Sequence, residues 1–447
     1  MEKIATKAVA VATLGCKVNQ YDSAAIVGLF RARGYSEVEF GTLADVYIIN
    51  TCTVTHLSDR KSRQLIRRAV KTNPEAVLVV TGCYAQTSPG ELTAMPEVDL
   101  VVGTSDRDKL VDLVEASGKA SGRGLGKAGT PVNAVSDIEK ACSYEELTAP
   151  IGQGRVRAFL KIQEGCRNFC SYCIIPYARG PLRSRQPEAV LSEAETLISG
   201  GFKEIVLTGI QTGAYGVDLE NKTNLAAIVE KLLRLPGLSR LRLGSIEPND
   251  LTPEMIDLMA QSQVFCHHLH IPLQSGSDRV LKLMRRRYLT ADYALLLKTL
   301  RESIPDLAVT SDIMVGFPGE TEEDFIDGLD FIEAMAFSGM HVFKYSPRRG
   351  TPAASFPNQV GPQAKELRSQ RLIALGEKLT QNYAEKFVGR NLPVLVEQPF
   401  SDKESYWEGL SDNYLRVIFL GQELFRGEIV DIEIKKSGIQ YQKGRII

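Results

Sequence analysis

The chain has 447 residues, enough for about three domains of ordinary size. Hydrophobic residues make up 44% and charged residues 24%, which excludes a disordered chain, a collagen-like fibre and a small disulfide-stapled domain. With 53 Lys and Arg against 54 Asp and Glu the net charge is −1, so nucleic acid could bind only at a local basic patch. No apolar run approaches the roughly 20 residues of a membrane helix, and no leader-like segment opens the chain, so we expect a cytoplasmic protein without a membrane partner.

The first part of the chain, residues 1–118, alternates strand-like and helix-like segments. The expected strands lie at 7–15, 44–50 and 75–82, and the expected helices near 23–33 and 58–71. Such alternation is typical of an α/β domain with a parallel sheet and right-handed crossovers. Residues 119–150 begin with a stretch rich in Gly, Ser and Lys and are expected to be a linker, because that composition cannot bury a core.

The second part, residues 151–378, repeats this alternation over a longer stretch. Its strand candidates are 155–163, 204–209, 240–246, 265–272, 308–318 and 341–346, and its clearest helices are 187–201 and 225–235. About six βα units predict a complete or partial (β/α) barrel, whose chemistry lies at the carboxyl ends of the strands. The third part, residues 380–447, loses the helical period and predicts a small all-β barrel.

Three cysteines of the second part, Cys166, Cys170 and Cys173, form a C-x3-C-x2-C pattern just after its first strand, and we call them the central set. Three thiolates on one tight loop can hold three corners of a 4Fe–4S cluster and leave the fourth iron open to an external ligand. The alternatives are a zinc site one ligand short and three unrelated buried thiols. Structural zinc sites usually supply four ligands in paired spacings, so the pattern favours the cluster.

Three further cysteines, Cys16, Cys52 and Cys83, each directly follow a predicted strand of the first part, and we call them the N-terminal set. The carboxyl ends of successive parallel strands lie along one edge of a sheet, where ligands bind. We therefore expect these three thiols to converge on one metal site. The alternative is three buried core thiols, which are common singly but are not expected at three equivalent positions.

The loop of the central set resembles the signature of the radical S-adenosylmethionine (SAM) superfamily. Its members bind SAM at the open iron and cleave it with one electron to release a 5′-deoxyadenosyl radical. Segments at later strand ends, including the turn at 316–321, resemble the SAM contacts of that superfamily. The resemblance implies cofactor-binding roles for Gly209, Gln211, Ser245, Glu247 and Gln274.

With both sets in view, nearly the whole chain resembles the methylthiotransferases. The matching segments are 14–20 (LGCKVNQ), 50–52 (NTC) and 82–86 (GCYAQ). This family carries an N-terminal α/β domain with an auxiliary 4Fe–4S cluster, a radical SAM barrel and a C-terminal TRAM domain that binds RNA. The resemblance implies that the N-terminal set holds the auxiliary cluster, and that the central set holds the catalytic SAM cluster.

The family replaces a C–H bond by C–S–CH3, and the resemblance implies two 4Fe–4S clusters and two SAM per turnover. The segment 17–23 (KVNQYDS) looks most like the branch that modifies carbon 2 of N6-threonylcarbamoyladenosine, next to the anticodon at position 37 of tRNA. The branches that act on isopentenyladenosine in tRNA and on an aspartate of a ribosomal protein are the alternatives. The implied partners are tRNA, an electron donor such as flavodoxin or ferredoxin, and a sulfur source. We expect a monomer.

Two features indicate an RNA substrate. The first is a basic run around the central set, which can contact phosphates without sequence preference. The alternative is that these residues form a solvated surface or pair with acids of other domains. It comprises Arg155, Arg157, Lys161, Arg167, Arg179, Arg183 and Arg185, with Arg285, Arg286 and Arg287 farther along. The second is the C-terminal module, where 409–414 and 426–430 resemble the TRAM pattern. Its Tyr406, Trp407 and Tyr414 are candidates for base stacking or for the barrel core.

The remaining residues of interest have structural interpretations. His268 and His270 share one face of a predicted strand while His267 faces the other way, so we expect core or pocket-lining residues. Cys142 and Cys266 match no motif and are expected to be structural. Two rival classes stay open. A radical SAM enzyme on a small molecule or protein, with an electron-carrying second cluster, is disfavoured by the C-terminal module. A non-catalytic iron–sulfur protein that binds RNA is disfavoured by the central set, because binding alone does not need a cluster with an open iron.

Overall fold

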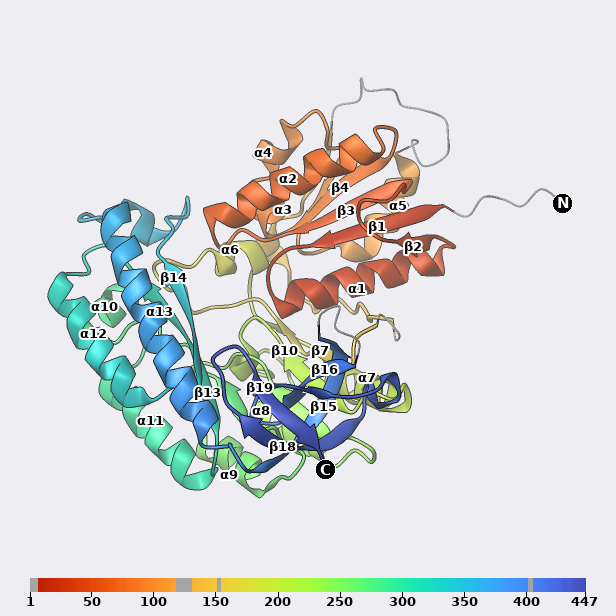
Figure 1. The fold of residues 1–447 in the computed structure, drawn as a ribbon. Helices are drawn as coiled ribbons and strands as arrows, with labels where there is room; N and C mark the ends of the chain where they lie inside the picture. The colour runs from red at the N-terminus through yellow and green to blue at the C-terminus, as the bar shows by residue number, and fades with distance from the viewer. Residues whose placement is uncertain (1–6, 118–130, 151–153, 401–404) are drawn as a thin grey trace.

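The computed structural model describes residues 7–117, 131–150, 154–400 and 405–447. Figure 1 shows an N-terminal lobe above a larger central lobe, with a small barrel near the C-terminus packed against the central lobe. The glycine-rich stretch of the predicted linker, at 118–130, lies outside the described residues.

The N-terminal lobe is built on a six-stranded parallel sheet in the order β2-β1-β3-β4-β5-β6. Its strands are β1 (Ala8–Thr13), β2 (Ser36–Val38), β3 (Val46–Thr51), β4 (Val77–Gly82), β5 (Leu100–Val102) and β6 (Val132–Ala134). Its helices are α1 (Lys17–Ala32), α2 (His56–Thr72), α3 (Cys83–Thr87), α4 (Pro89–Thr93) and α5 (Leu110–Ala116), preceded by a 3-10 turn η1 (Arg107–Lys109). Helices α1 and α5 pack on one face, and α2, α3 and α4 on the other. The predicted parallel α/β sheet is confirmed, and β6 joins it from within the predicted linker.

The sequence explains both the strands and one difference from the prediction. Strands β3 and β4 are continuous apolar runs buried along their whole length, as expected for a parallel sheet covered on both faces. Helix α1 begins at Lys17 rather than near Ser23. Its first turns bury the polar residues Asn19 and Asp22, whose side chains bind other parts of the chain, so an apolar period becomes visible only later.

The central lobe contains six parallel strands in two sheets, ordered β7-β10-β11 and β12-β13-β14. These strands are β7 (Arg157–Lys161), β10 (Glu204–Thr208), β11 (Arg240–Leu243), β12 (His268–His270), β13 (Ala308–Val315) and β14 (Gly339–Lys344). Bridges from Leu241 to Phe265 and from Ser245 to His270 join the two sheets, so the strands follow one another as a partial barrel. The predicted (β/α) barrel is confirmed in its partial form.

One large apolar cluster joins the strands to the helices on the outside of this barrel. The outer helices are α7 (Pro187–Ser199), α8 (Leu225–Leu233), α9 (Pro253–Gln261), α11 (Thr290–Ser303), α12 (Glu322–Met335) and α13 (Pro362–Glu385). Shorter elements at the strand ends are β8 (Gln163–Glu164), α6 (Ile175–Arg179), β9 (Arg183–Ser184) and α10 (Asp278–Leu283). The helices therefore leave the inner face of the strands free for other side chains.

The C-terminal module is a closed barrel of five strands in the order β15-β16-β17-β19-β18. They are β15 (Asn391–Pro399), β16 (Tyr406–Ser411), β17 (Arg416–Leu420), β18 (Ile429–Lys436) and β19 (Gln442–Ile446). Trp407 lies in its core, so this residue belongs to the barrel core and is not available for base stacking. Helix α13 continues past residue 380, because Leu379 and Tyr383 extend its apolar stripe from the central lobe onto the barrel core.

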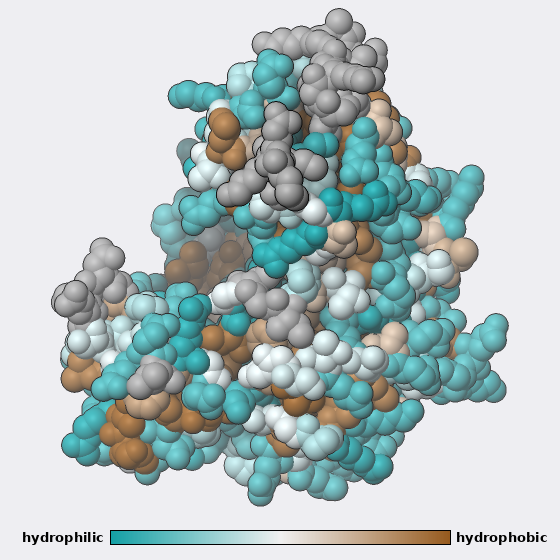
Figure 2. Space-filling model, turned by 90° about the vertical axis from the view of Figure 1, so that its right-hand side faces the viewer, coloured by the Kyte–Doolittle hydropathy of each residue, from teal (hydrophilic) through white to brown (hydrophobic). Residues whose placement is uncertain are grey.

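Figure 2 views the molecule from the right-hand side of Figure 1. The surface is largely hydrophilic, and hydrophobic side chains gather in a hollow between the N-terminal lobe and the parts below it. In the portions of the chain that the structure describes, no helix combines the length and the apolar character needed to cross a membrane.

Candidate active site

The N-terminal set lies along one edge of the N-terminal sheet. Cys16 directly precedes α1, Cys52 follows β3, and Cys83 is the first residue of α3, directly after β4. Strands β1, β3 and β4 are neighbours and parallel, so all three cysteines stand at the carboxyl edge. The strand order reverses beside β1, which is where ligands bind in open α/β sheets. The structure thus brings together the three residues that the sequence predicts to converge.

A close approach at Gly15 holds two of these thiol-bearing segments in contact. Its φ is +102°, and a Cβ atom there would lie 2.9 Å from the Cys52 Cβ and 3.1 Å from the Cys52 Sγ, so only glycine fits. Burial raises the pKa of the Cys83 thiol to about 12, the Arg179 guanidinium opposes this, and the thiols of Cys52 and Cys16 raise it further. The three sulfurs therefore lie close enough to influence one another's charge.

Arg179 connects the N-terminal set to the central lobe. This side chain is fully buried, and its Nε donates a hydrogen bond to the Cys83 Sγ at 3.3 Å. Its Nη1 donates to Asp22 at 2.9 Å and to Glu164 at 3.1 Å, and its Nη2 donates to the Asn19 amide oxygen. Because Glu164 belongs to β8, just before the central set, one arginine spans both cysteine-bearing regions.

Arg179 is part of a buried network of charges between the two lobes. The Asp22 carboxylate pairs with Arg107 at 2.5 Å and with Lys161 at 2.6 Å, and Glu164 pairs with the same lysine at 2.7 Å. These groups are at least 97% buried, and Arg107 also pairs with Glu145 of the segment that joins the lobes. Charge pairing at this depth fixes the relative position of the lobes, since an unpaired ion here would be costly.

The same network corrects the predicted phosphate-binding run. Four of its members are buried and paired or hydrogen-bonded within the protein: Lys161, Arg179, Arg183 and Arg185. Of the rest, Arg155, Arg167, Arg285 and Arg287 remain exposed. The prediction of phosphate contact is therefore wrong for the buried members. Lys161 and Arg179 form ion pairs with Asp22 of the N-terminal lobe and Arg185 with Glu146 of the joining segment, whereas Arg183 donates to the Arg179 carbonyl.

Removing one carboxylate from this network tests its contribution to stability. Asp22→Asn is expected to lower the free energy of unfolding by roughly 3–5 kcal/mol, because Arg107, Lys161 and Arg179 lose a shared partner in a buried site. Denaturant unfolding, followed for the transition of the N-terminal lobe, measures the change. The matched control is Asp112→Asn in the exposed pair with Arg33, for which a much smaller change is expected because solvent screens this pair. Equal effects of the two variants would contradict this role.

The central set occupies the loop between β8 and α6. Gly165 precedes it with a φ of +78°, and a Cβ there would overlap the Pro181 carbonyl, so the loop can turn only at glycine. The Cys166 backbone N–H donates to the Gly180 carbonyl at 3.0 Å, and that of Cys173 donates to the Cys170 carbonyl at 3.0 Å. These bonds fold the loop back on itself and gather its three thiols.

The central thiols also influence one another. Burial raises the pKa of Cys166 to about 11, the Asn168 backbone N–H opposes this, and the Cys170 thiol raises it further. Burial raises the pKa of Cys173 as well, and Cys170 adds to the effect. Arg286 reaches the set from another element, donating from Nη1 to the Cys170 Sγ at 3.4 Å while pairing with Glu247. Metal binding must displace the thiol protons, so these buried thiols would bind a cluster with release of protons.

The predicted SAM contacts lie around the central set at strand ends. Gln211 accepts a hydrogen bond from the Arg167 N–H at 3.3 Å and donates one to Asn168 at 3.4 Å, so it touches the cysteine loop directly. Its own position depends on Gln163, whose side-chain oxygen accepts from the backbone N–H groups of Ile210 and Gln211.

A cavity of about 100 Å³ opens beside this loop and contains two of the predicted contacts, Gln211 and Glu247, next to Cys170. Its other lining residues include Asn168, Asp250 and Arg286, which sequence reasoning does not single out for SAM. Burial raises the pKa of Asp250 to about 6, and the neighbouring Glu247 adds to the rise.

The other three predicted contacts lie at strand ends outside the lining of this cavity. Gly209 follows β10, Ser245 follows β11 and is exposed, and Gln274 follows β12 with a φ of +69°. The Gln274 backbone pairs with β13 through bonds to Asp312 and Met314. The structure thus places all five predicted contacts after strands of the barrel, but gathers only two of them around this cavity.

A second contact brings the N-terminal lobe over the barrel mouth from the opposite side. Arg348 lies in the segment after β14, and its Nη2 donates to the Thr53 hydroxyl at 2.6 Å and to Asp59 at 2.7 Å. Thr53 directly follows Cys52. Arg179, which follows the central set, and Arg348, which follows β14, therefore both bond to the edge of the N-terminal sheet that bears the N-terminal set.

The geometry of the thiols bears on the kind of metal site. Among the residues described, no group of three or more His, Cys, Asp or Glu side chains converges as the ligands of one metal ion do. In a 4Fe–4S cube each thiolate binds a different corner, so its ligands need not converge on a point. Two sets of three soft donors, each at a carboxyl strand edge, fit two such cubes better than a zinc ion.

The C-terminal module packs against side chains of β11 and β12 in the partial barrel. Arg242 donates to the Asp412 carbonyl at 2.8 Å and Arg240 to the Pro393 carbonyl at 2.7 Å. Tyr414 stacks on His268 with ring centroids 4.3 Å apart, so this tyrosine lines the inner space instead of the outer surface. His268 and His270 both bond the Thr310 hydroxyl and thus share one face, as strand alternation requires.

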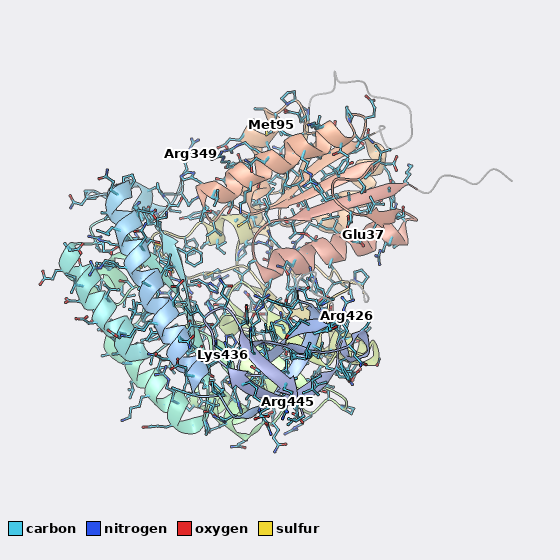
Figure 3. All side chains as sticks on the ribbon, viewed as in Figure 1. Glu37, Met95, Arg349, Arg426, Lys436 and Arg445 are labelled. Atoms are coloured by element: carbon cyan, nitrogen blue, oxygen red, sulfur yellow. The ribbon has the colours of Figure 1, made fainter. Side chains whose placement is uncertain are left out.

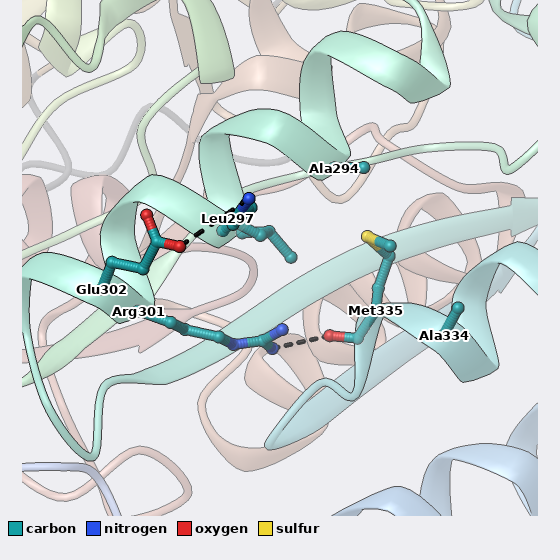
Figure 4. A pocket seen from close by; sticks show the side chains of 7 residues that line it. Ala294, Leu297, Arg301, Glu302, Ala334 and Met335 are labelled. Atoms are coloured by element: carbon teal, nitrogen blue, oxygen red, sulfur yellow. Dashed lines mark hydrogen bonds and ion pairs between the residues drawn. The ribbon is translucent and has the colours of Figure 1, made fainter.

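Other cavities lie away from the cysteine sets. Figure 4 shows a groove between α11 and α12, where Arg301 donates to the Met335 carbonyl at 2.6 Å. It is formed by outer helices. A cavity of about 620 Å³ between the lobes includes the exposed Cys142, whereas Cys266 is buried beside Arg242. Neither cysteine joins a set.

Comparison with known proteins agrees with this architecture. Residues 160–332 match the radical SAM superfamily, and residues 8–103 match a family described as "Uncharacterized protein family UPF0004". In fold, the chain is similar to the radical SAM methyltransferase TsrM from Kitasatospora setae, with a TM-score of 0.56 at 17% identity over 78% of this chain and 77% of that one. A three-cysteine loop after the first strand of such a barrel defines a radical SAM enzyme.

The full-length relatives narrow this class. The chain is 48% identical to the threonylcarbamoyladenosine tRNA methylthiotransferase MtaB of Bacillus subtilis (strain 168), over 98% of this chain and 96% of the relative. It is 38% identical to the protein of the same name from Aquifex aeolicus (strain VF5), over 87% and 92%. It is 35% identical to the tRNA-2-methylthio-N(6)-dimethylallyladenosine synthase of Pelotomaculum thermopropionicum, over 97% and 96%. The chain belongs to the radical SAM methylthiotransferase family.

Proposed function

We propose that this chain adds a methylthio group to carbon 2 of N6-threonylcarbamoyladenosine at position 37 of tRNA. The observation that carries the proposal is the 48% identity, over nearly the full length, to a relative named for that substrate. Relatives named for dimethylallyladenosine reach 35% identity over similar lengths, which supports the threonylcarbamoyl branch over that alternative.

Under this proposal the six cysteines of the two sets form two cofactor sites. The N-terminal set holds an auxiliary 4Fe–4S cluster, and the central set holds the cluster that binds SAM. Gln211 and Glu247, with Asn168, orient the methionine and ribose groups of SAM beside Cys170. When bound, the clusters and SAM supply a carbon radical and a sulfur atom, which side-chain acids and bases cannot provide.

The protein's own contribution is position and the exclusion of water. Arg179 and Arg348 clamp the N-terminal lobe over the barrel mouth, so the two sets meet in an enclosed space. A base inserted between them is held near both sites at once, which removes much of the entropy cost of bringing reactants together. The buried charge network resists relative motion of the lobes, and this keeps the spacing constant.

The tRNA is expected to bind through exposed basic residues that lie outside the buried charge network between the lobes. Figure 3 shows Arg426, Lys436 and Arg445 on the C-terminal barrel, and Arg349 at the edge of the central lobe near the N-terminal lobe. All four side chains are exposed. Such charges contact phosphates without reading sequence, as a module that positions the anticodon arm requires.

Mass spectrometry of tRNA nucleosides tests the proposal. In a strain that lacks this gene, the 2-methylthio derivative of threonylcarbamoyladenosine is expected to disappear while the unmodified nucleoside accumulates. Return of the gene should restore the derivative. Loss of a methylthiolated isopentenyladenosine instead would assign the chain to the other tRNA branch, and unchanged nucleosides would refute a tRNA substrate.

Iron content tests the two cofactor sites separately from the substrate. Reconstituted protein is expected to carry about eight irons per chain, in two clusters of four. Replacing all three cysteines of one set by Ala should leave about four. Iron and labile sulfide analysis measures both values. A wild-type content of about four would contradict the auxiliary site.

A further inference from the structure

A group of cationic side chains lines the lower part of the inner space, beside the N-terminal set. Arg157 and Arg242 lie over the Tyr414 ring, with guanidinium carbons 5.9 Å and 4.9 Å from its centroid. Lys17, the residue after Cys16, interacts electrostatically with all three of these side chains. Three separate parts of the chain thus supply one site: α1, the barrel and the C-terminal module.

Positive charge is in excess in this group. Arg157 pairs with Glu397 at 2.6 Å, and Arg242 pairs with Glu204 at 2.7 Å. Arg240 shares Glu204, at 3.6 Å. No hydrogen bond or ion pair among the described residues uses the Lys17 ammonium group. Among the described residues the cations therefore outnumber the carboxylates, and Lys17 is the one that forms no ion pair, although Glu204 interacts with it electrostatically.

Two buried polar atoms of the same group also have no partner within the described part of the chain. They are Arg157 Nη1 and His268 Nδ1, and the His268 side chain is 97% buried beneath the Tyr414 ring. Buried polar atoms without partners are uncommon in folded proteins, and one explanation is a site that binds a ligand or an ion. An anion with several acceptor oxygens would satisfy both the orphaned guanidinium nitrogen and the free ammonium.

We propose that Lys17 and Arg157, beside the Tyr414 ring, bind the carboxylate of the threonylcarbamoyl group and so select this nucleoside. The inference rests on the proposed function, and it deepens it by assigning substrate choice to particular side chains. A carboxylate matches the excess charge, whereas an apolar isopentenyl group would leave the cations unpaired in a buried site. Discrimination of this kind is strong because the wrong substrate leaves buried polar groups without partners.

Binding of two anticodon stem-loop RNAs to the reconstituted full chain tests the assignment. One RNA carries threonylcarbamoyladenosine and the other plain adenosine at the same position. Wild-type protein should bind the first more tightly, and Lys17→Gln should weaken that RNA alone by roughly tenfold to hundredfold, the range for a charge-assisted hydrogen bond. Lys17→Arg should retain the preference, and Arg157→Gln should reduce it like Lys17→Gln.

The control is Lys298→Gln, an exposed lysine on the outer helix α11, which should leave both affinities unchanged. Iron content equal to wild type shows that Lys17→Gln keeps both clusters and its fold. Equal weakening of both RNAs would assign Lys17 to a phosphate, and no weakening would assign it no contact; either result overturns the inference. If wild-type protein methylthiolates the nucleoside but binds the two RNAs equally, this inference alone fails. If it forms no such product, the proposed function fails too.

Discussion

Replacing Cys170 by Ala is expected to abolish formation of 5′-deoxyadenosine from SAM. Cys170 lines the cavity that also contains Gln211 and Glu247, so under the proposed function its thiol would bind the cluster at the place where SAM binds. Even partners outside the ligand shell of a metal usually contribute 10–100-fold to affinity or activity. Loss of a ligand should therefore reduce SAM cleavage by more than roughly 100-fold. Chromatography of 5′-deoxyadenosine after chemical reduction measures the effect.

The matched control is Cys142→Ala, which removes a thiol that is exposed and belongs to neither set. It should leave SAM cleavage unchanged. Cleavage that persists in Cys170→Ala would mean that the central set does not hold the reactive cluster. Binding of SAM, measured separately, shows whether the loss lies in binding or in the reductive step.

Replacing Cys52 by Ala is expected to separate SAM cleavage from methylthiolation. Cys52 directly follows β3 of the N-terminal lobe and is not one of the three cysteines of the central loop, so 5′-deoxyadenosine should still form. Transfer of the methylthio group should stop, because the auxiliary site would lack one of its three thiols. Mass spectrometry of tRNA nucleosides and 5′-deoxyadenosine from one reaction measures both outcomes. Alanine is smaller than cysteine and fits beside Gly15 without a new overlap, so the fold is expected to persist.

Two results would decide against this assignment of Cys52. If the variant still produced methylthiolated tRNA, the auxiliary role would be wrong. If it lost SAM cleavage as completely as Cys170→Ala, the two sets would act as a single site. Cys142→Ala again serves as the control for the removal of a thiol.

Much of the fold follows from local patterns in the sequence. Strands β3 and β4 are unbroken apolar runs, and α8 has a well-marked apolar face, so each can be read without knowledge of its neighbours. The start of α1 cannot, because Asn19 and Asp22 are buried by partners distant in the sequence. The short strand β6 could not be predicted either, because it forms by pairing with β5 at the edge of the sheet.

In the candidate site, too, some residues can be predicted from local patterns and others cannot. The thiols were predictable, because each follows a strand and parallel strands share a carboxyl edge. The burial of part of the basic run was not predictable. The sequence does not distinguish a cation that contacts phosphate from one such as Arg179, which pairs with Asp22 of another domain. The sequence predicts a phosphate contact for Arg286, yet in the structure this residue donates a hydrogen bond to the Cys170 Sγ. Such contacts depend on tertiary placement of loops that no local pattern encodes.

The turn after β16 has a consequence for how this enzyme could be altered. Arg240 and Arg242 hold the turn by its backbone carbonyls, and its Tyr414 completes the wall of the reaction space. If the C-terminal barrel binds the tRNA, as proposed above, it is thus also a structural part of the wall beside the cysteine sets. It is therefore not an independent module that can be exchanged for the equivalent domain of a relative. A chimera would change the tRNA-binding surface and the wall beside the reaction site together.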